Sequence, residues 1–147
     1  MNKDLVYLVQ TDTTVGFSSG NDEKLFSAKQ RPKEKKILNT VDSFKTLKQH
    51  TRVPKNFKKL VRNSKKTTFI YPNTNSYRVI DKSFKFHEFI SKFGILLSTS
   101  ANISGGHFEY KFASNASDII VYEKDDFNEK TASKIYILKK KKSIRIR

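Results

Sequence analysis

The chain has 147 residues, the size of one ordinary domain, and its 36% hydrophobic and 12% aromatic content is above that of most disordered chains. It contains no cysteine, which excludes disulfides, thiolate zinc sites and cysteine nucleophiles. Its formal net charge of +16 favours polyanionic partners such as nucleic acid, nucleotide phosphates or anionic lipid surfaces. An alternative explanation of the charge is an A/T-biased genome, which enriches surface lysines without any function.

The first predicted element is a short apolar run over residues 5–10, which has the length of a buried strand. Three threonines and an aspartate follow at residues 11–14, so the strand would deliver hydroxyl groups to its C-terminal end. Gly16 and Gly20 predict that the next segment is a loop.

A helix is predicted next. Asn21 or Asp22 suits its N-cap, the helix should run to about Gln30, and Pro32 should stop it. A second short helix should begin after Pro54, a residue that suits the first turn.

In the rest of the chain, predicted helices alternate with predicted strands. Phe57, Leu60 and Val61 should point inward from the helix after Pro54, and Gly94 suits the C-terminal cap of a helix over residues 84–93. Another helix is predicted over residues 42–50. Predicted strands cover residues 36–40, 67–71, 77–80, 95–98, 118–122, 134–138 and 143–147. The pattern predicts a single domain over 1–147, of the α/β class, with three layers and a mixed sheet.

The most informative segment is Leu97-Ser-Thr-Ser-Ala-Asn-Ile-Ser-Gly105, where a buried strand runs into small and hydroxyl-bearing residues. Ligands of open α/β sheets bind beyond the carboxyl ends of strands, and small side chains let backbone N–H groups approach an anion. On the residues alone, a polar turn capped by Ser and Asn is an equally good interpretation.

As a string, residues 98–105 resemble the STSANxSG signature of the YrdC/Sua5 (YrdC/YciO/YwlC) family. Four further segments resemble family motifs in the family's order. They are Thr11-Asp-Thr13 with Gly16 (PTDTVYG), Lys29-Gln-Arg-Pro32 with Lys35 (KxRPxxK), Arg78-Val79 before an Asp (the VRxP-type strand), and the closing Ile-Arg-Ile-Arg147.

The resemblance implies a YrdC/RibB-like fold, a twisted mixed sheet with helices packed around it and a basic concave face. It also implies an L-threonylcarbamoyl-AMP synthase, which joins L-threonine, bicarbonate and ATP and releases pyrophosphate. The product serves the threonylcarbamoylation of adenosine 37 in tRNA by a downstream threonylcarbamoyl transferase. Cations and hydroxyl donors are what such a reaction requires, since negative charge develops on a carbamate and on phosphates.

The family's functional residues carry over onto matching positions. Catalytic roles fall to Lys29 and Arg31, which would hold the phosphates and the carbamate. ATP-binding roles fall to Ser98, Ser100, Asn102 and Arg147. Threonine-binding roles fall to Thr11, Arg78, Thr99 and Ser133, with Arg78 as the partner of the threonine carboxylate.

Mg²⁺ is expected with the ATP, and no protein-bound metal is predicted, because the three histidines lack metal-ligand spacing. His87 is expected at the edge of the core. No signal peptide or membrane-spanning segment is predicted, so we expect a cytoplasmic protein without a membrane partner.

Several segments depart from the family motifs. Thr14 and Val15 stand where the family has Val-Tyr, and residues 63–68 replace WPGPLT without its Trp, Pro or Gly. Ser133 is what remains of a Ser-Thr pair. The alternative function is therefore a catalytically weakened member that binds nucleotide or RNA, either tRNA or double-stranded RNA, in a strongly salt-dependent way.

Overall fold

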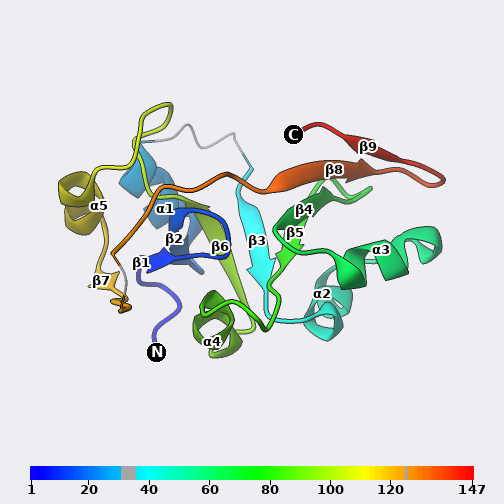
Figure 1. Ribbon diagram of the computed structural model, residues 1–147, viewed down its shortest axis with the longest axis horizontal. Coiled ribbons are helices and arrows are strands. Elements are labelled where there is room, and N and C mark those ends of the chain that lie inside the picture. Colours follow the sequence, from blue (N-terminus) through cyan, green and yellow to red (C-terminus); the bar gives the residue numbers. More distant parts are fainter. Residues whose placement is uncertain (31–35, 125) are drawn as a thin grey trace.

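The computed structural model describes residues 1–30, 36–124 and 126–147, and in these residues nine strands form one mixed sheet (Figure 1). The order across the sheet is β7-β1-β2-β6-β3-β5-β4-β8-β9. Three neighbouring pairs are parallel, namely β1 with β7, β3 with β5, and β4 with β8. The strands are β1 (Tyr7–Gln10), β2 (Val15–Ser19), β3 (Leu38–Val41), β4 (Thr67–Ile70), β5 (Ser76–Val79), β6 (Ile95–Ser100), β7 (Ile119–Ile120), β8 (Lys134–Leu138) and β9 (Ser143–Arg145).

Short helices connect and cover the strands. They are α1 (Asp22–Lys29), α2 (Phe44–His50), the 3₁₀ turn η1 (Lys55–Phe57), α3 (Lys58–Asn63), α4 (Phe86–Ser91) and α5 (Tyr110–Ala116). The predicted cap of α1 is confirmed, because the Asn21 side chain accepts a hydrogen bond from the Lys24 N–H. None of the described helices is long and apolar enough to cross a membrane.

The helices lie on both faces of the sheet, which confirms the predicted three-layer arrangement (Figure 1). Alternate residues of β1 face opposite sides: Leu8 packs with α1 and α5, whereas Tyr7 and Val9 pack with α4. The strand register places the cluster around Leu47 of α2 and Val61 of α3 on the same side as Leu8. Among the described helices, α4 is therefore the one that covers this face of the sheet, and the part of the face beyond the end of α4 is available for a functional site.

The predicted loop is wrong at Gly16, which lies within β2, between β1 and β6, whereas Gly20 lies as predicted in the connection between β2 and α1. A Cβ on Gly16 would stand 2.9 Å from the Thr99 carbonyl oxygen and 3.2 Å from Thr11 Cγ2. The glycine thus marks a close approach of chain segments inside a sheet rather than a turn. The five residues of β2 are all buried.

Other boundaries differ from the prediction. Helix α5 was not expected; it has no side-chain cap and is held by the buried Ala113. Leu60, expected to point inward, is 44% exposed, while Val61 is buried as predicted. The helix predicted over 84–93 spans only α4, although Gly94, with φ +83°, does cap it by donating to the Ile90 carbonyl.

The predicted strands are otherwise present, with changed ends. β3 begins two residues later than expected, β6 continues to Ser100, β7 is two residues long, and β9 ends at Arg145. β8 matches its prediction, and the expected hairpin to β9 is closed by the Lys139 N–H donating to the Lys142 carbonyl at 2.8 Å. His87 lies half-buried at the edge of the core, as predicted, with its Nε2 2.9 Å from the Asp42 carbonyl oxygen.

Candidate functional site

A cavity of about 300 Å³ opens on the α4 face of the sheet, beyond the C-terminal end of β1. Its lining residues come from β2 to β6, β8 and the connecting segments. It takes in seven of the predicted site residues: Thr11, Arg78, Ser98, Thr99, Ser100, Ser133 and Arg147. Long-range strand pairing is thus what collects motifs that are far apart in the sequence.

One wall of the cavity is the turn that follows β1. The Thr11 hydroxyl donates to the Thr14 carbonyl at 2.6 Å and accepts from the Thr13 N–H at 3.1 Å. The Thr14 hydroxyl in turn accepts from the N–H of Lys130, in the segment that leads to β8. These bonds fix the threonine-rich turn against the rest of the cavity.

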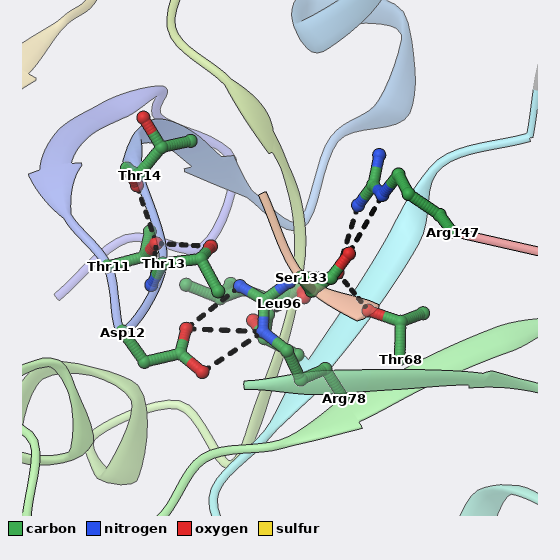
Figure 2. A network of polar contacts seen from close by, with 10 residues as sticks. Thr11, Asp12, Thr13, Thr14, Thr68, Arg78, Leu96, Ser133 and Arg147 are labelled. Atoms are coloured by element: carbon green, nitrogen blue, oxygen red, sulfur yellow. Dashed lines mark hydrogen bonds and ion pairs between the residues drawn. The ribbon is translucent and has the colours of Figure 1, made fainter. Parts of the chain in front are cut away.

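Arg78 of β5 meets this turn through a buried ion pair with Asp12 (Figure 2). Arg78 Nε donates to both carboxylate oxygens, at 3.1 and 3.2 Å, and Nη2 lies 2.9 Å from Oδ1. The two side chains are 5% and 0% exposed. Charge-assisted pairing of this kind fixes the guanidinium plane, while Nη1 makes no hydrogen bond to the described residues.

The sequence analysis gave Asp12 no role, although it named this residue within the Thr11-Asp-Thr13 motif. Its position between two site threonines in the Thr11-Asp-Thr13 motif was the available signal. A carboxylate buried beside a cavity needs a cationic partner, and Arg78 is that partner.

Ser133 joins three segments on the opposite wall (Figure 2). Its hydroxyl lies 2.8 Å from the Thr68 hydroxyl and accepts from Arg147 Nη2 at 3.0 Å. Arg147 Nε donates to the Ser133 carbonyl at 2.8 Å. Arg78 and Arg147 line the same cavity. Partial burial and, second, the positive charge of Arg78 lower the pKa of Arg147.

Thr68 is a cavity residue that the sequence interpretation missed. It is the last residue of the segment that replaces WPGPLT, and it keeps the threonine on which that motif ends. Because the segment lacks the Trp, Pro and Gly of the motif, the retained threonine was not recognised as a site residue.

Lys29 lies next to the cavity, buried at the C-terminal end of α1. Its Nζ donates to the carbonyl of Ser100 at 2.9 Å, to the hydroxyl of Ser100 at 3.1 Å and to Asn102 Oδ1 at 3.2 Å. Three predicted residues from two motifs are therefore in direct contact, although only Ser100 lines the cavity. Arg31, Pro32 and Lys35 of the same motif lie outside the described residues.

Asn102 also organises its own loop. Its Nδ2 donates to the Ile103 carbonyl at 2.8 Å and to the Gly106 carbonyl at 2.7 Å. The interpretation of this segment as a turn stabilised by Asn therefore describes one part of its structure. The other part is the strand end, where Ser98 and Ser100 face the cavity.

The polar side chains that line the cavity are hydroxyl groups and cations. Among the described residues the cavity has nine hydroxyl side chains, three cationic ones and no carboxylate. The three cations are Lys36, Arg78 and Arg147. In the part of the chain that the structure describes, no three His, Asp or Glu side chains come together as metal ligands would. The arrangement suits a multiply charged oxyanion.

Comparison with known proteins identifies the family. The family model Sua5/YciO/YrdC, described as "Telomere recombination", matches residues 1–146. The chain therefore belongs to the Sua5/YciO/YrdC family, as the sequence motifs predicted. No curated protein gave a significant match.

Solved structures share the fold. P. abyssi Sua5, crystallised with L-threonine, is 16% identical with a TM-score of 0.77 and covers 97% of this chain. E. coli YciO is 14% identical with a TM-score of 0.77, and covers 99% of this chain and 83% of its own. HypF, in a phosphate- and nucleotide-bound form, is 13% identical with a TM-score of 0.73, and covers 97% of this chain but 26% of its own. The chain spans about half the length of P. abyssi Sua5, 50% in the threonine complex.

Proposed function

Since the chain belongs to the Sua5/YciO/YrdC family, we propose that it is an L-threonylcarbamoyl-AMP synthase. The threonine amine attacks the carbon of bicarbonate and forms a carbamate with loss of water. A carbamate oxygen then attacks the α-phosphorus of ATP, and pyrophosphate leaves. The observation that carries the proposal is the cavity in which Arg78 and Arg147 face nine hydroxyl groups, with no carboxylate among its described lining residues.

Threonine is assigned to the wall formed by Thr11 and Arg78, with Thr99 and Ser133 nearby. Asp12 occupies Nε and Nη2 of Arg78, so the threonine carboxylate would bind through Nη1. The pairing holds the guanidinium in one orientation before substrate arrives, which lowers the entropic cost of binding. The threonine complex of P. abyssi Sua5 supports an amino-acid site in this fold.

ATP is assigned to Ser98, Ser100 and Arg147, with Asn102 behind Ser100. A guanidinium can bind phosphate oxygens through two N–H groups, and serine hydroxyls add donors. The nucleotide-bound form of HypF supports this assignment. Mg²⁺ would arrive bound to the ATP phosphates and neutralise part of their charge.

Lys29 holds the end of β6 through Ser100 and places a positive charge beside the phosphates. That charge would stabilise the negative charge that develops as pyrophosphate leaves. Arg31 keeps the phosphate- and carbamate-binding role predicted from its motif. The product would then pass to a transferase that modifies adenosine 37 of tRNA.

The test is pyrophosphate release by the purified chain, with threonine, bicarbonate or ATP omitted in turn. Release should require all three substrates and should fall by roughly 10²-fold or more in Lys29→Ala, as when one electrostatic donor is lost from an active site. Lys24→Ala is the matched control, because Lys24 lies exposed on the same helix. Release that is no faster than in Lys29→Ala would refute the proposal.

A further inference from the structure

Residues 107–129 form an acidic and aromatic segment in a basic chain. They contain six Asp and Glu against two Lys, a formal charge of −4, whereas the other 124 residues carry +20. The segment supplies α5 and β7, which lie at the end of the molecule opposite the lysine-rich hairpin of β8 and β9 (Figure 1). Its negative charge is therefore separated from that hairpin by more than the distance of about 8–10 Å over which salt screens exposed charges.

A cavity of about 380 Å³ lies within this segment. We call it the aromatic cavity, because its described lining consists of four aromatic rings and two carboxylates, without a cation. The lining residues are Phe108, Tyr110, Tyr122, Phe127, Glu123 and Asp126. None of them lines the cavity that holds Arg78 and Arg147, so the aromatic cavity is a separate feature of the molecule.

The two phenylalanines anchor the aromatic cavity to the core. Phe108 and Phe127 are half-buried and pack against the core cluster between the sheet and helices α1 and α5. Next to Phe127, the Asn128 N–H donates to Gln10 Oε1 at 2.8 Å, and the Asn128 carbonyl accepts from the Val15 N–H at 3.2 Å. The positions of these two rings are therefore fixed by the fold before a ligand arrives, which lowers the entropic cost of binding.

The two tyrosines, by contrast, are exposed. Tyr110 is 46% and Tyr122 is 71% exposed, and their hydroxyl groups lie 3.0 Å apart. Each tyrosine ring also packs on Phe127, with ring centroids 6.2 and 6.3 Å away and interplanar angles of 24° and 36°. Rings that served only to hold the chain together would be buried, so the exposure of these gathered rings indicates a binding surface.

Glu123 and Asp126 bring negative charge to these rings. Neither side chain makes an ion pair or a hydrogen bond with the residues that the structure describes. The two carboxylates give the aromatic cavity a local negative potential, although the chain as a whole is basic.

An organic ammonium ion matches both the rings and the charge. The faces of aromatic rings attract a cation that lies within about 6 Å of the ring centroid, and carboxylates attract it through their charge. Methyl groups on the nitrogen fill space between apolar rings and require no hydrogen-bond acceptors. A metal ion would instead require several oxygen ligands around it, which a mainly aromatic lining does not offer.

We propose that the aromatic cavity binds a methylated ammonium cation, with the charge near Glu123 and Asp126 and the methyl groups against the aromatic rings. The cation would belong to a small molecule such as choline or to a methylated lysine side chain of a partner protein. The proposal is independent of the synthase activity.

The experiment is an NMR titration of the purified chain that follows the ring signals of Tyr110, Tyr122 and Phe127. The probes are choline, a short peptide that contains trimethyllysine, and dimethylbutanol, an uncharged isostere of choline in which carbon replaces nitrogen. Choline or the peptide should give saturable shifts in these rings. Dimethylbutanol should bind roughly tenfold or more weakly, because it has the shape of choline without its charge.

Tyr122 provides the variants that test the rings. Tyr122→Leu should weaken choline binding roughly two- to fivefold, the contribution of one cation–π contact at an exposed site. Tyr122→Phe keeps the ring and should bind choline like the wild type. Thermal unfolding of both variants establishes that they are folded. Equal weakening in the two variants would overturn the proposal, because the ring would then not be what binds the cation.

A pair of double variants tests the carboxylates. Glu123→Gln with Asp126→Asn should weaken choline binding, and the loss should shrink as salt rises. Glu23→Gln with Glu88→Gln makes the same charge change at exposed positions on α1 and α4 and should bind like the wild type. Equal losses in the two double variants would overturn the proposal, as would equal binding of choline and dimethylbutanol or equal binding of choline and glucose.

The two cationic probes distinguish the sources of the ligand. Tighter binding of the trimethyllysine peptide identifies a partner protein, and tighter binding of choline identifies a small molecule. The absence of saturable shifts with both probes would overturn the proposal.

Pyrophosphate release is measured on the same preparations. Tyr122→Leu should keep it, because the aromatic cavity shares no lining residue with the cavity of Arg78 and Arg147. Cation binding without pyrophosphate release would leave the aromatic cavity standing and refute the synthase, so the two proposals fail separately.

Discussion

Arg78 and Asp12 form an ion pair that is almost completely buried and that joins β5 to the turn after β1, 66 residues away in the sequence. Arg78 donates through Nε and Nη2, so one edge of its guanidinium group is occupied by Asp12. The pair connects stability to function, because the residue assigned to the threonine carboxylate depends on Asp12 for its orientation.

Asp12→Asn should destabilise the protein strongly. The substitution leaves the Arg78 charge buried without a counter-ion, which typically costs about 3–5 kcal/mol in the free energy of unfolding. Urea denaturation measures this loss. Lys65→Ala, which breaks the exposed pair with Asp81, should cost less than about 1 kcal/mol. Equal losses for the two variants would show that the buried pair is not what holds the turn.

Gly16→Ala should impair threonine binding as well as stability. The added Cβ would meet the Thr99 carbonyl at 2.9 Å and Thr11 Cγ2 at 3.2 Å, and overpacking of this kind costs about 1–3 kcal/mol. The KM for threonine should rise. Gly94→Ala is the control, because its Cβ meets no atom within 4 Å and only its positive φ is strained. A KM that changes equally in both variants would contradict the assignment of Thr11.

Ser133→Ala should weaken ATP binding. It removes the hydroxyl that orients Arg147 Nη2 and bonds to Thr68, while the backbone contact of Arg147 Nε remains. Loss of one hydrogen bond to a charged group predicts a KM for ATP that is roughly tenfold higher or more. Ser114→Ala removes an exposed hydroxyl on α5 and should leave the KM unchanged. An unchanged KM in Ser133→Ala would show that the Ser133 hydroxyl does not orient Arg147 for ATP.

The contact between His107 and Glu129 should make the free energy of unfolding depend on pH. The hydrogen bond to Glu129, at 3.0 Å, raises the pKa of His107 above its usual value of 6.5. Bonds from the Phe108 N–H and then from His107 lower the pKa of Glu129. The stabilising contribution of His107 is present below its unfolded pKa and is lost as pH rises through its folded pKa, while that of Glu129 is lost as pH falls through its own folded pKa.

A proton NMR titration of the His107 ring measures this effect. In Glu129→Gln the pKa of His107 should fall, whereas Glu88→Gln, an exposed carboxylate on α4, should leave it unchanged. A His107 pKa that is the same in all three proteins would contradict the pairing.

Local patterns predicted much of the sheet because burial follows alternation and turn residues. β8 and its hairpin to β9 matched, as did the cap at Asn21. β2 was missed because a glycine in a strand looks like a turn until the neighbouring chain segment is known, here the Thr99 carbonyl. α5 was missed because packing of Ala113 holds it rather than a cap.

The candidate site followed from the motifs rather than from local patterns. Seven of the predicted residues line one cavity, but their partners are non-local: Lys29 bonds to Ser100 across 71 residues and Arg78 to Asp12 across 66. No periodicity in the sequence encodes such pairs, because strand order and register decide them. The role of Asp12 and the cavity position of Thr68 therefore emerged only from the structure.

The most direct test of the proposed synthase activity is mass spectrometric detection of threonylcarbamoyl-AMP formed by the purified chain. With threonine, ATP, Mg²⁺ and bicarbonate labelled with heavy carbon, we expect a labelled adenylate that accompanies pyrophosphate and is lost in Lys29→Ala. Pyrophosphate release without any threonine-containing adenylate, or an adenylate that carries no label from bicarbonate, would contradict it.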